Sequence, residues 1–491
     1  MMLLHDFTPP RDCVGASIVG IVTLSAYFIQ HLIDVSSRHF AEALDIPLYN
    51  TSIYFSKLYS SRSLSTGLGA LFHYLIAVTL GVNVKTSSFI ALLFLVFTRM
   101  VLIMTLSSTY IVSVEVYKVL NFDAFVLGFF QMTHFRTIWR YLFVRSIFVD
   151  LGRFVVFVIQ ALLDLCLKHR PLVMIRVQCW ISFVITLIAA CLWFFYIYYF
   201  KTAYPESKPK ESIISKTTKE DVSTDLNKFK CKYFKKYEYR RHAAVVPRTG
   251  CRFKEYSIGN VSVFLMFMTA SLVRNFLFPG VLPYSVLSRG KCHSVNMVLP
   301  VVSIVPPCVL FVFYSECTDL CKKSYWVRNL FWIFMIPQLI SLIYALYTVH
   351  RKVLFNTEFS GSHVTVFLTT SLLMFSYGFI ESMAINHYQM AINPSESLIT
   401  YHYIVSTFYS FLFSRLSVGY NCARVEYDYC LTPFYPTYKK GAASSITFWI
   451  RDVLRRAYND VEKRKSTKND RGRSSKKEGA IKCPQKQTQG H

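Results

Sequence analysis

The sequence predicts an all-α, polytopic membrane protein with about 11 transmembrane helices, six before a basic central segment and five after it. Of its 491 residues, 53% are hydrophobic and only 17% are charged, whereas soluble domains carry about 25% charged residues. Apolar runs of membrane-spanning length recur along the chain. Between the two groups of runs, the polar segment from Lys201 to Glu255 contains 15 Lys and Arg residues.

The first group of apolar runs predicts six spans, at residues 14–33, 65–82, 87–112, 121–134, 143–167 and 172–200. The run at 121–134 is the weakest of them. Polar and acidic residues follow the first run without a small-residue cleavage site, so we expect it to be retained rather than removed as a signal peptide. Residues 34–65 are of mixed character and predict a loop.

The second group predicts five spans, at residues 258–278, 296–314, 327–349, 363–385 and 397–418. Four parts follow from this division: an N-terminal six-helix bundle (1–200), a basic cytoplasmic loop (201–257), a C-terminal five-helix bundle (258–418) and a basic, partly disordered tail (419–491). Within the tail, residues 445–461 place apolar and basic residues on opposite sides of a helix. That pattern is typical of a helix lying on a membrane surface, and equally compatible with a marginal helix in a floppy tail.

The distribution of charge predicts the orientation. The chain carries a formal net charge of +26, most of it in the central loop and the tail. Basic loops beside spans orient towards the cytoplasm, so we place the N-terminus and the central loop there. The protein is then integral to the plasma membrane or an intracellular membrane, with the side of the tail left open. No nucleic-acid-binding motif accompanies the charge, so the expected partners are the lipid bilayer and a small solute, with no nucleic acid.

Ionisable side chains inside spans are costly and therefore mark functional or structural polar sites. Those that we single out, within or at the end of predicted spans, are Arg99, Asp150, Arg153, Arg274, Glu316, Asp319, Lys322, Lys323 and Glu381. Asp150 and Arg153 are three residues apart and share a helix face, as Asp319 and Lys323 do at a spacing of four. Such a pair either only holds helices together or forms the wall or gate of a solute pathway.

Enzymatic signatures are absent from the sequence. It contains no Gly-rich phosphate loop, no His-Glu-x-x-His and no Gly-x-Ser-x-Gly motif. We therefore predict that the protein is not an enzyme, and the sequence implies no cofactor and no metal.

Four short stretches, together with the division into six and five spans, resemble the equilibrative nucleoside transporters. These stretches are Gly20-Ile21-Val22-Thr23-Leu24, Phe278-Pro279-Gly280-Val281, Asp319-Leu320-Cys321-Lys322-Lys323-Ser324, and Phe375-Ser376-Tyr377-Gly378-Phe379 followed by Pro394-Ser395-Glu396. The chain departs from the family at Ala26-Tyr27-Phe28, where the family has Pro-Trp-Asn. It also has Lys322 and Lys323 in place of Gly-Arg, and Tyr377 in place of Asn.

The resemblance implies a two-bundle, major-facilitator-like fold that transports by alternating access. In such a site, Tyr27 would stack on a nucleobase, and Asp319 and Lys323 would bind the ribose or the base edge. Tyr377 would also belong to the substrate site, and the Asp150–Arg153 pair would gate it. The predicted function is facilitative transport of nucleosides or nucleobases. The alternative is a transporter-fold protein that carries another small solute or acts as a non-transporting membrane adaptor.

Overall fold

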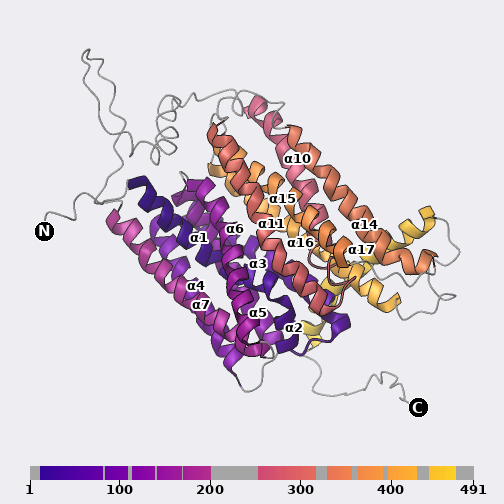
Figure 1. The fold of residues 1–491 in the computed structure, drawn as a ribbon. Helices are drawn as coiled ribbons and strands as arrows, with labels where there is room; N and C mark the ends of the chain where they lie inside the picture. Colours follow the sequence, from indigo (N-terminus) through magenta and orange to yellow (C-terminus); the bar gives the residue numbers. More distant parts are fainter. Residues whose placement is uncertain are drawn as a thin grey trace, which may run out of the picture. The chain divides into compact units, whose positions relative to one another are not determined.

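Helices make up most of the described parts of the chain (Figure 1). The computed structural model describes residues 11–80, 83–108, 113–138, 141–167, 170–200, 253–316, 329–355, 363–390, 396–427 and 442–470. No strand occurs in these ranges. Seven of their helices are long and apolar enough to cross a membrane. The predicted all-α, polytopic class is therefore confirmed, whereas the predicted orientation and the division at residues 201–257 remain predictions.

Each of the first six predicted spans coincides with a helix. In chain order the elements are α1 (Arg11–Val35), α2 (Ser37–Ala43), the 3-10 turn η1 (Leu48–Asn50), α3 (Thr51–Leu80), α4 (Val84–Ser107), α5 (Ser113–Thr137), α6 (Leu142–Cys166) and α7 (Pro171–Phe194), which continues as the π-helical η3 (Phe195–Phe200). Pro171 occupies the start of α7, where its missing N–H leaves no intrahelical bond unmade.

The predicted loop at residues 34–65 is largely helical, which corrects the sequence prediction. It contains α2 and the first half of α3. Hydropathy missed this half of α3 because its polar side chains are buried inside the protein: Ser52, Ser56, Ser60 and Arg62 are at most 6% exposed. A helix that turns polar residues towards neighbouring helices has low hydropathy although it is buried.

The later helices coincide with the remaining predicted spans. They are α10 (Phe253–Leu277), α11 (Arg289–Glu316), the 3-10 turn η4 (Leu330–Phe334), α14 (Met335–Phe355), α15 (His363–Met390) and α16 (Glu396–Tyr427). Helix α11 contains three internal prolines, at residues 300, 306 and 307. Prolines are tolerated in membrane helices when neighbouring helices satisfy the freed backbone groups.

The helices pack in two sets that meet along α11 and α15. In the first set, α5 packs against α3 and α4, while α1 packs against α6 and α7. In the second, α15 packs against α10, α11 and α14. Contacts between the sets join α11 to α1, α2 and α6, and α15 to α6. We call these the N-set (α1–α7) and the C-set (α10–α15); the interface between them positions the site described below.

A reciprocal pair of glycines lets α3 and α5 approach closely. A Cβ added to Gly69 would collide with the backbone carbonyl of Phe125, and one added to Gly128 with that of Thr66. Hydrophobic burial gives little drive for helices to associate in lipid, so close backbone packing at small residues matters more there. Both glycines are thus required by the geometry of this helix pair.

We expect Gly128→Ala to separate α3 from α5 and to lower the apparent melting temperature of the detergent-solubilised protein. Overpacking costs about 1–3 kcal/mol, and here the clash is with backbone rather than with a flexible side chain. Gly290→Ala is the control, because a Cβ at Gly290 has nothing within 4 Å. Equal melting temperatures for the two variants would show that α3 and α5 do not pack with their backbones in contact at Gly128.

The chain divides into two compact units, residues 1–417 and residues 418–491. In the second unit, the end of α16 packs closely on α17 (Ala442–Asp470) at Gly419. The helix predicted at residues 445–461 is confirmed, and Ile446, Ile450, Leu454 and Tyr458 form an exposed stripe along it at intervals of four. Its placement on a membrane surface remains a prediction.

Candidate solute-binding cavity

A cavity of ≈ 240 Å³ lies in the first unit and is lined by residues of both helix sets. The N-set contributes residues from α1, α3, α5 and α6, and the C-set from α10, α11 and α15; α16 completes the wall. Two of the predicted substrate residues, Tyr27 and Tyr377, are among them, as are the predicted gate residues Asp150 and Arg153. These four residues, predicted from distant parts of the sequence, therefore share one cavity.

Positive charge predominates in the lining. Four arginines and two carboxylates face the cavity, namely Arg62, Arg145, Arg153, Arg274, Asp150 and Glu381. Two of the arginines have an acidic partner: Arg153 lies 3.0 Å from Asp150, and Arg62 lies 3.5 Å from Asp123 behind the wall. Arg145 and Arg274 form no salt bridge with any acidic side chain in the described ranges. Two carboxylates that form no salt bridge in the described ranges lie near this group of arginines: Glu381 in the lining, and the buried Asp34, which interacts electrostatically with Arg62, Arg153 and Arg274.

Arg145 is held against aromatic rings of the N-set. Its Nη2 donates to the hydroxyl of Tyr27, and its guanidinium lies 4.3 Å from the centre of the Phe135 ring. A guanidinium over an aromatic face is stabilised by a cation–π interaction. The arginine is only 5% exposed. These contacts hold the Arg145 side chain in place. It forms no salt bridge with an acidic side chain of the described ranges.

On the C-set side of the cavity, Arg274 likewise lies beside an aromatic ring and forms a hydrogen bond to a neutral side chain. Its Nη1 donates to Asn275 Oδ1 over 2.7 Å, and its guanidinium lies 5.4 Å from the centre of the Tyr377 ring. Its Nε is buried and has no hydrogen-bond partner among the residues that the structure describes. A buried donor without an acceptor costs free energy. A solute that brings an acceptor into the cavity would therefore gain a hydrogen bond from Arg274 Nε.

Arg99 lies outside the cavity. It is 1% exposed in the N-set, where Nη2 donates to the carbonyl of Ala26 over 2.9 Å and Nη1 donates to Thr186. Its Nε lies 4.0 Å from Asp123 Oδ1, and Asp123 also accepts from Thr98 over 3.1 Å. This cluster (Arg62, Arg99 and Asp123) joins α3, α4 and α5 internally, which is a structural role.

The two remaining predicted substrate residues, Asp319 and Lys323, lie outside the described residues. Conversely, the structure brings forward residues that sequence reasoning did not single out: Arg62, Arg145, Gln131, His402 and Tyr403. Arg145 had a usable signal, since it lies within the predicted span at 143–167. Arg62 had none, because its helix was predicted as a loop.

Comparison with known proteins supports the fold alone. No family model matches the chain, and no curated protein sequence matches it. Among solved structures, the POT family transporter PepTSo aligns with a TM-score of 0.54 at 11% identity, over 94% of this chain and 99% of that chain. The xylose transporter XylE from E. coli aligns with a TM-score of 0.52 at 9% identity, over 91% and 96%.

These alignments extend over nearly the whole length of both chains and confirm the predicted major-facilitator-like fold. The seven apolar helices of membrane-spanning length separately indicate an integral membrane protein. The alignments do not distinguish the nucleoside transporter family, which the sequence resembles, from other families that share this fold. At such low identity a solute is not transferable from one chain to another.

Proposed function

We propose that the protein is an alternating-access membrane transporter whose cavity binds a small solute carrying an anionic group. The observation that supports this most strongly is a pair of arginines in one cavity, Arg145 and Arg274, neither of which forms a salt bridge within the described ranges. Charge without a salt bridge inside a helix bundle is costly and marks functional sites. Carboxylate and phosphate groups match the planar, bidentate donors of arginine better than they match lysine.

The placement of these arginines suits a carrier rather than a static binding protein. Arg145 belongs to α6 in the N-set and Arg274 to α10 in the C-set. An anion held by both would link the two helix sets across the cavity. In two-bundle transporters the solute site lies at the interface between the rocking halves, so a bound anion would favour states in which both sets close around it.

The Asp150–Arg153 pair is proposed as a movable part of the cavity wall. Both side chains are on α6, and Ser303 of α11 lines the cavity beside them. Their separation of 3.0 Å makes a complete ion pair within one helix. An incoming anion would compete with Asp150 for Arg153, so opening of the pair would accompany binding of the solute.

Transport of nucleosides or nucleobases is the second candidate. The aromatic rings of Tyr27 and Tyr377 line the cavity, and aromatic faces stack on bases without demanding their identity. The sequence stretch around Tyr377 is also one of those that resemble the nucleoside transporters. A neutral solute brings no counter-ion for the two arginines, which is why we rank this candidate second. A nucleoside monophosphate would use the rings and the arginines together.

Uptake into cells that lack their own carriers separates these candidates. The labelled panel contains adenosine, uridine and hypoxanthine as neutral solutes, and AMP, succinate and inorganic phosphate as anions. We expect saturable uptake of at least one anion, with the solute recovered unchanged. Uptake of neutral solutes only would favour the second candidate. No uptake of any solute, with the protein shown in the membrane, would favour a non-transporting protein of the same fold.

A further inference from the structure

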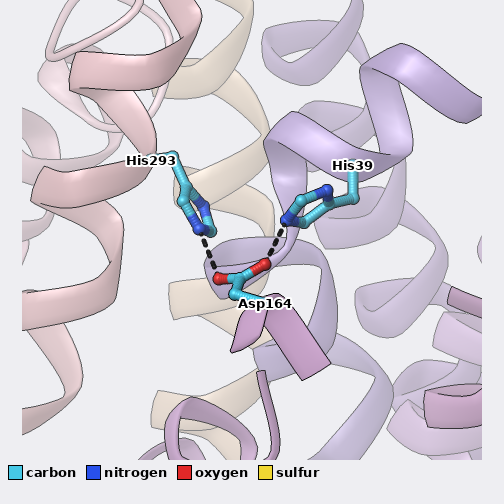
Figure 2. A group of neighbouring side chains, drawn as sticks. All are labelled: His39, Asp164 and His293. Carbon is cyan, nitrogen blue, oxygen red and sulfur yellow. Dashed lines mark hydrogen bonds and ion pairs between the residues drawn. The ribbon is translucent and has the colours of Figure 1, made fainter. Parts of the chain in front are cut away.

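Three side chains that the proposed function does not use converge where α2, α6 and α11 meet (Figure 2). His39 Nε2 lies 2.9 Å from Asp164 Oδ1, and His293 Nε2 lies 2.8 Å from Asp164 Oδ2. The two imidazole rings approach edge to face, with their centres 5.0 Å apart. One available ligand atom from each residue lies within 4.8 Å of the other two.

We propose that His39, Asp164 and His293 bind a divalent transition-metal ion of the Zn²⁺ class. Two imidazole nitrogens and one carboxylate oxygen form an established ligand set for such ions, which bind these atoms at about 2.0–2.2 Å. The arrangement needs only small movements, because an ion placed among the three atoms replaces the two close contacts between imidazole nitrogen and carboxylate oxygen. Water would supply the remaining coordination position.

Metal ligation through Nε2 sets a requirement on the other ring nitrogen, Nδ1, of each histidine. If each Nε2 binds a metal, the ring proton resides on Nδ1, which then requires an acceptor. The Nδ1 atoms of His39 and His293 are both buried and lack a hydrogen-bond partner in the part of the chain that is described. Glu42 Oε2 lies 3.9 Å from His39 Nδ1, so a small shift would give a carboxylate–histidine–metal arrangement.

The cluster is enclosed, yet reachable from solvent. The side chains of His39 and His293 are 5% and 12% exposed, whereas that of Asp164 is 28% exposed. The carboxylate therefore offers an entry point for an ion, and the imidazoles form the inner wall. Partial burial strengthens the binding of a cation because water competes less well for it.

The position of the cluster predicts what a bound metal would do. His39 and Asp164 belong to the N-set and His293 to the C-set. Nearby hydrogen bonds already join the sets at this end: Asn296 donates to Ser37 over 2.9 Å, and Arg289 donates to Thr51 over 3.2 Å. A metal would add a stronger link between the sets. By holding the two sets together, the bound metal would inhibit transport. This effect on transport rests on the proposed function, whereas metal binding itself does not.

Zinc binding by the purified full-length chain tests the site directly. The detergent-solubilised protein is stripped with chelator and titrated with Zn²⁺ alone, and bound metal is counted by mass spectrometry. We expect His293→Asn and His39→Asn each to lose one equivalent of Zn²⁺, with affinity at this site lowered by more than about 100-fold, since even outer-shell changes cost 10–100-fold. The double variant should lose the same single equivalent, not two.

Two further variants keep the test decisive. His363→Asn removes a histidine of α15 outside the cluster and should leave stoichiometry unchanged. His293→Cys retains a ligand and should bind Cd²⁺ in preference to Zn²⁺, because thiolates favour softer ions. Equal binding by the wild-type protein and all histidine variants would overturn the proposal. The binding assay requires no transport. Absence of metal binding would therefore leave the proposed transport function intact, and absence of transport would leave the metal-site proposal intact.

Discussion

Replacing Arg274 with Gln is expected to reduce uptake of the transported anion by about tenfold or more. Hydrogen bonds to charged groups contribute about 1.5–3 kcal/mol, and 1.4 kcal/mol corresponds to a factor of ten in binding. Gln preserves the polarity of the side chain but removes its charge and its bidentate donors. Uptake by cells expressing each variant, normalised to the amount of protein in the membrane, measures the effect.

The controls separate charge from general damage. Arg38→Gln removes an arginine that is 37% exposed and paired with Glu42 over 2.8 Å, outside the cavity, and should leave uptake unchanged. Arg274→Lys keeps the charge without the planar fork, so its uptake should be intermediate. If Arg274→Gln transports the anion as well as wild type does, Arg274 is not part of the solute site.

Asp123→Ala is expected to cause a large loss of stability. Asp123 is 3% exposed and lies 3.5 Å from Arg62 Nη2 and 4.0 Å from Arg99 Nε. Its removal would take the shared counter-ion away from two buried positive charges. Breaking a buried ion pair by removing one partner costs about 3–5 kcal/mol. We therefore expect a low yield and a clearly lower apparent melting temperature in detergent.

The matched control is on the same helix. Glu115 forms an exposed pair with Lys118 over 2.6 Å, and exposed pairs contribute little to stability. Glu115→Gln should therefore melt as the wild type does. Combining Asp123→Ala with Arg99→Met should recover part of the loss, because it removes one of the stranded charges. A wild-type melting temperature for Asp123→Ala would contradict the structural role of the cluster.

The sequence was sufficient to place the helices because membrane spans must be long and apolar. It failed where helices turn polar residues inward, as in the first half of α3, whose serines and Arg62 face other helices. It also could not identify α2, which at seven residues is too short for a hydropathy window. Tertiary burial, rather than local composition, decides the structure in both places.

The candidate site was predictable only in part. A charge inside an apolar run is visible in sequence, which is how Asp150, Arg153, Arg274 and Glu381 came forward and why Arg145 could have done so. Helix packing decides which of these charges face the same cavity. It also puts Arg99 outside that cavity. The histidine–aspartate cluster could not be found, because its members are more than 120 residues apart and have no motif spacing.

The most direct test of the central claim is flux through the purified protein. The wild-type chain, Arg38→Gln and the double variant Arg145→Gln/Arg274→Gln are reconstituted separately into liposomes and given labelled AMP, succinate, phosphate, adenosine and uridine. We predict saturable uptake of an anion by the wild type and by Arg38→Gln, and none by the double variant. Flux of neutral nucleosides alone, undiminished in the double variant, would contradict an anion-binding role for the cavity.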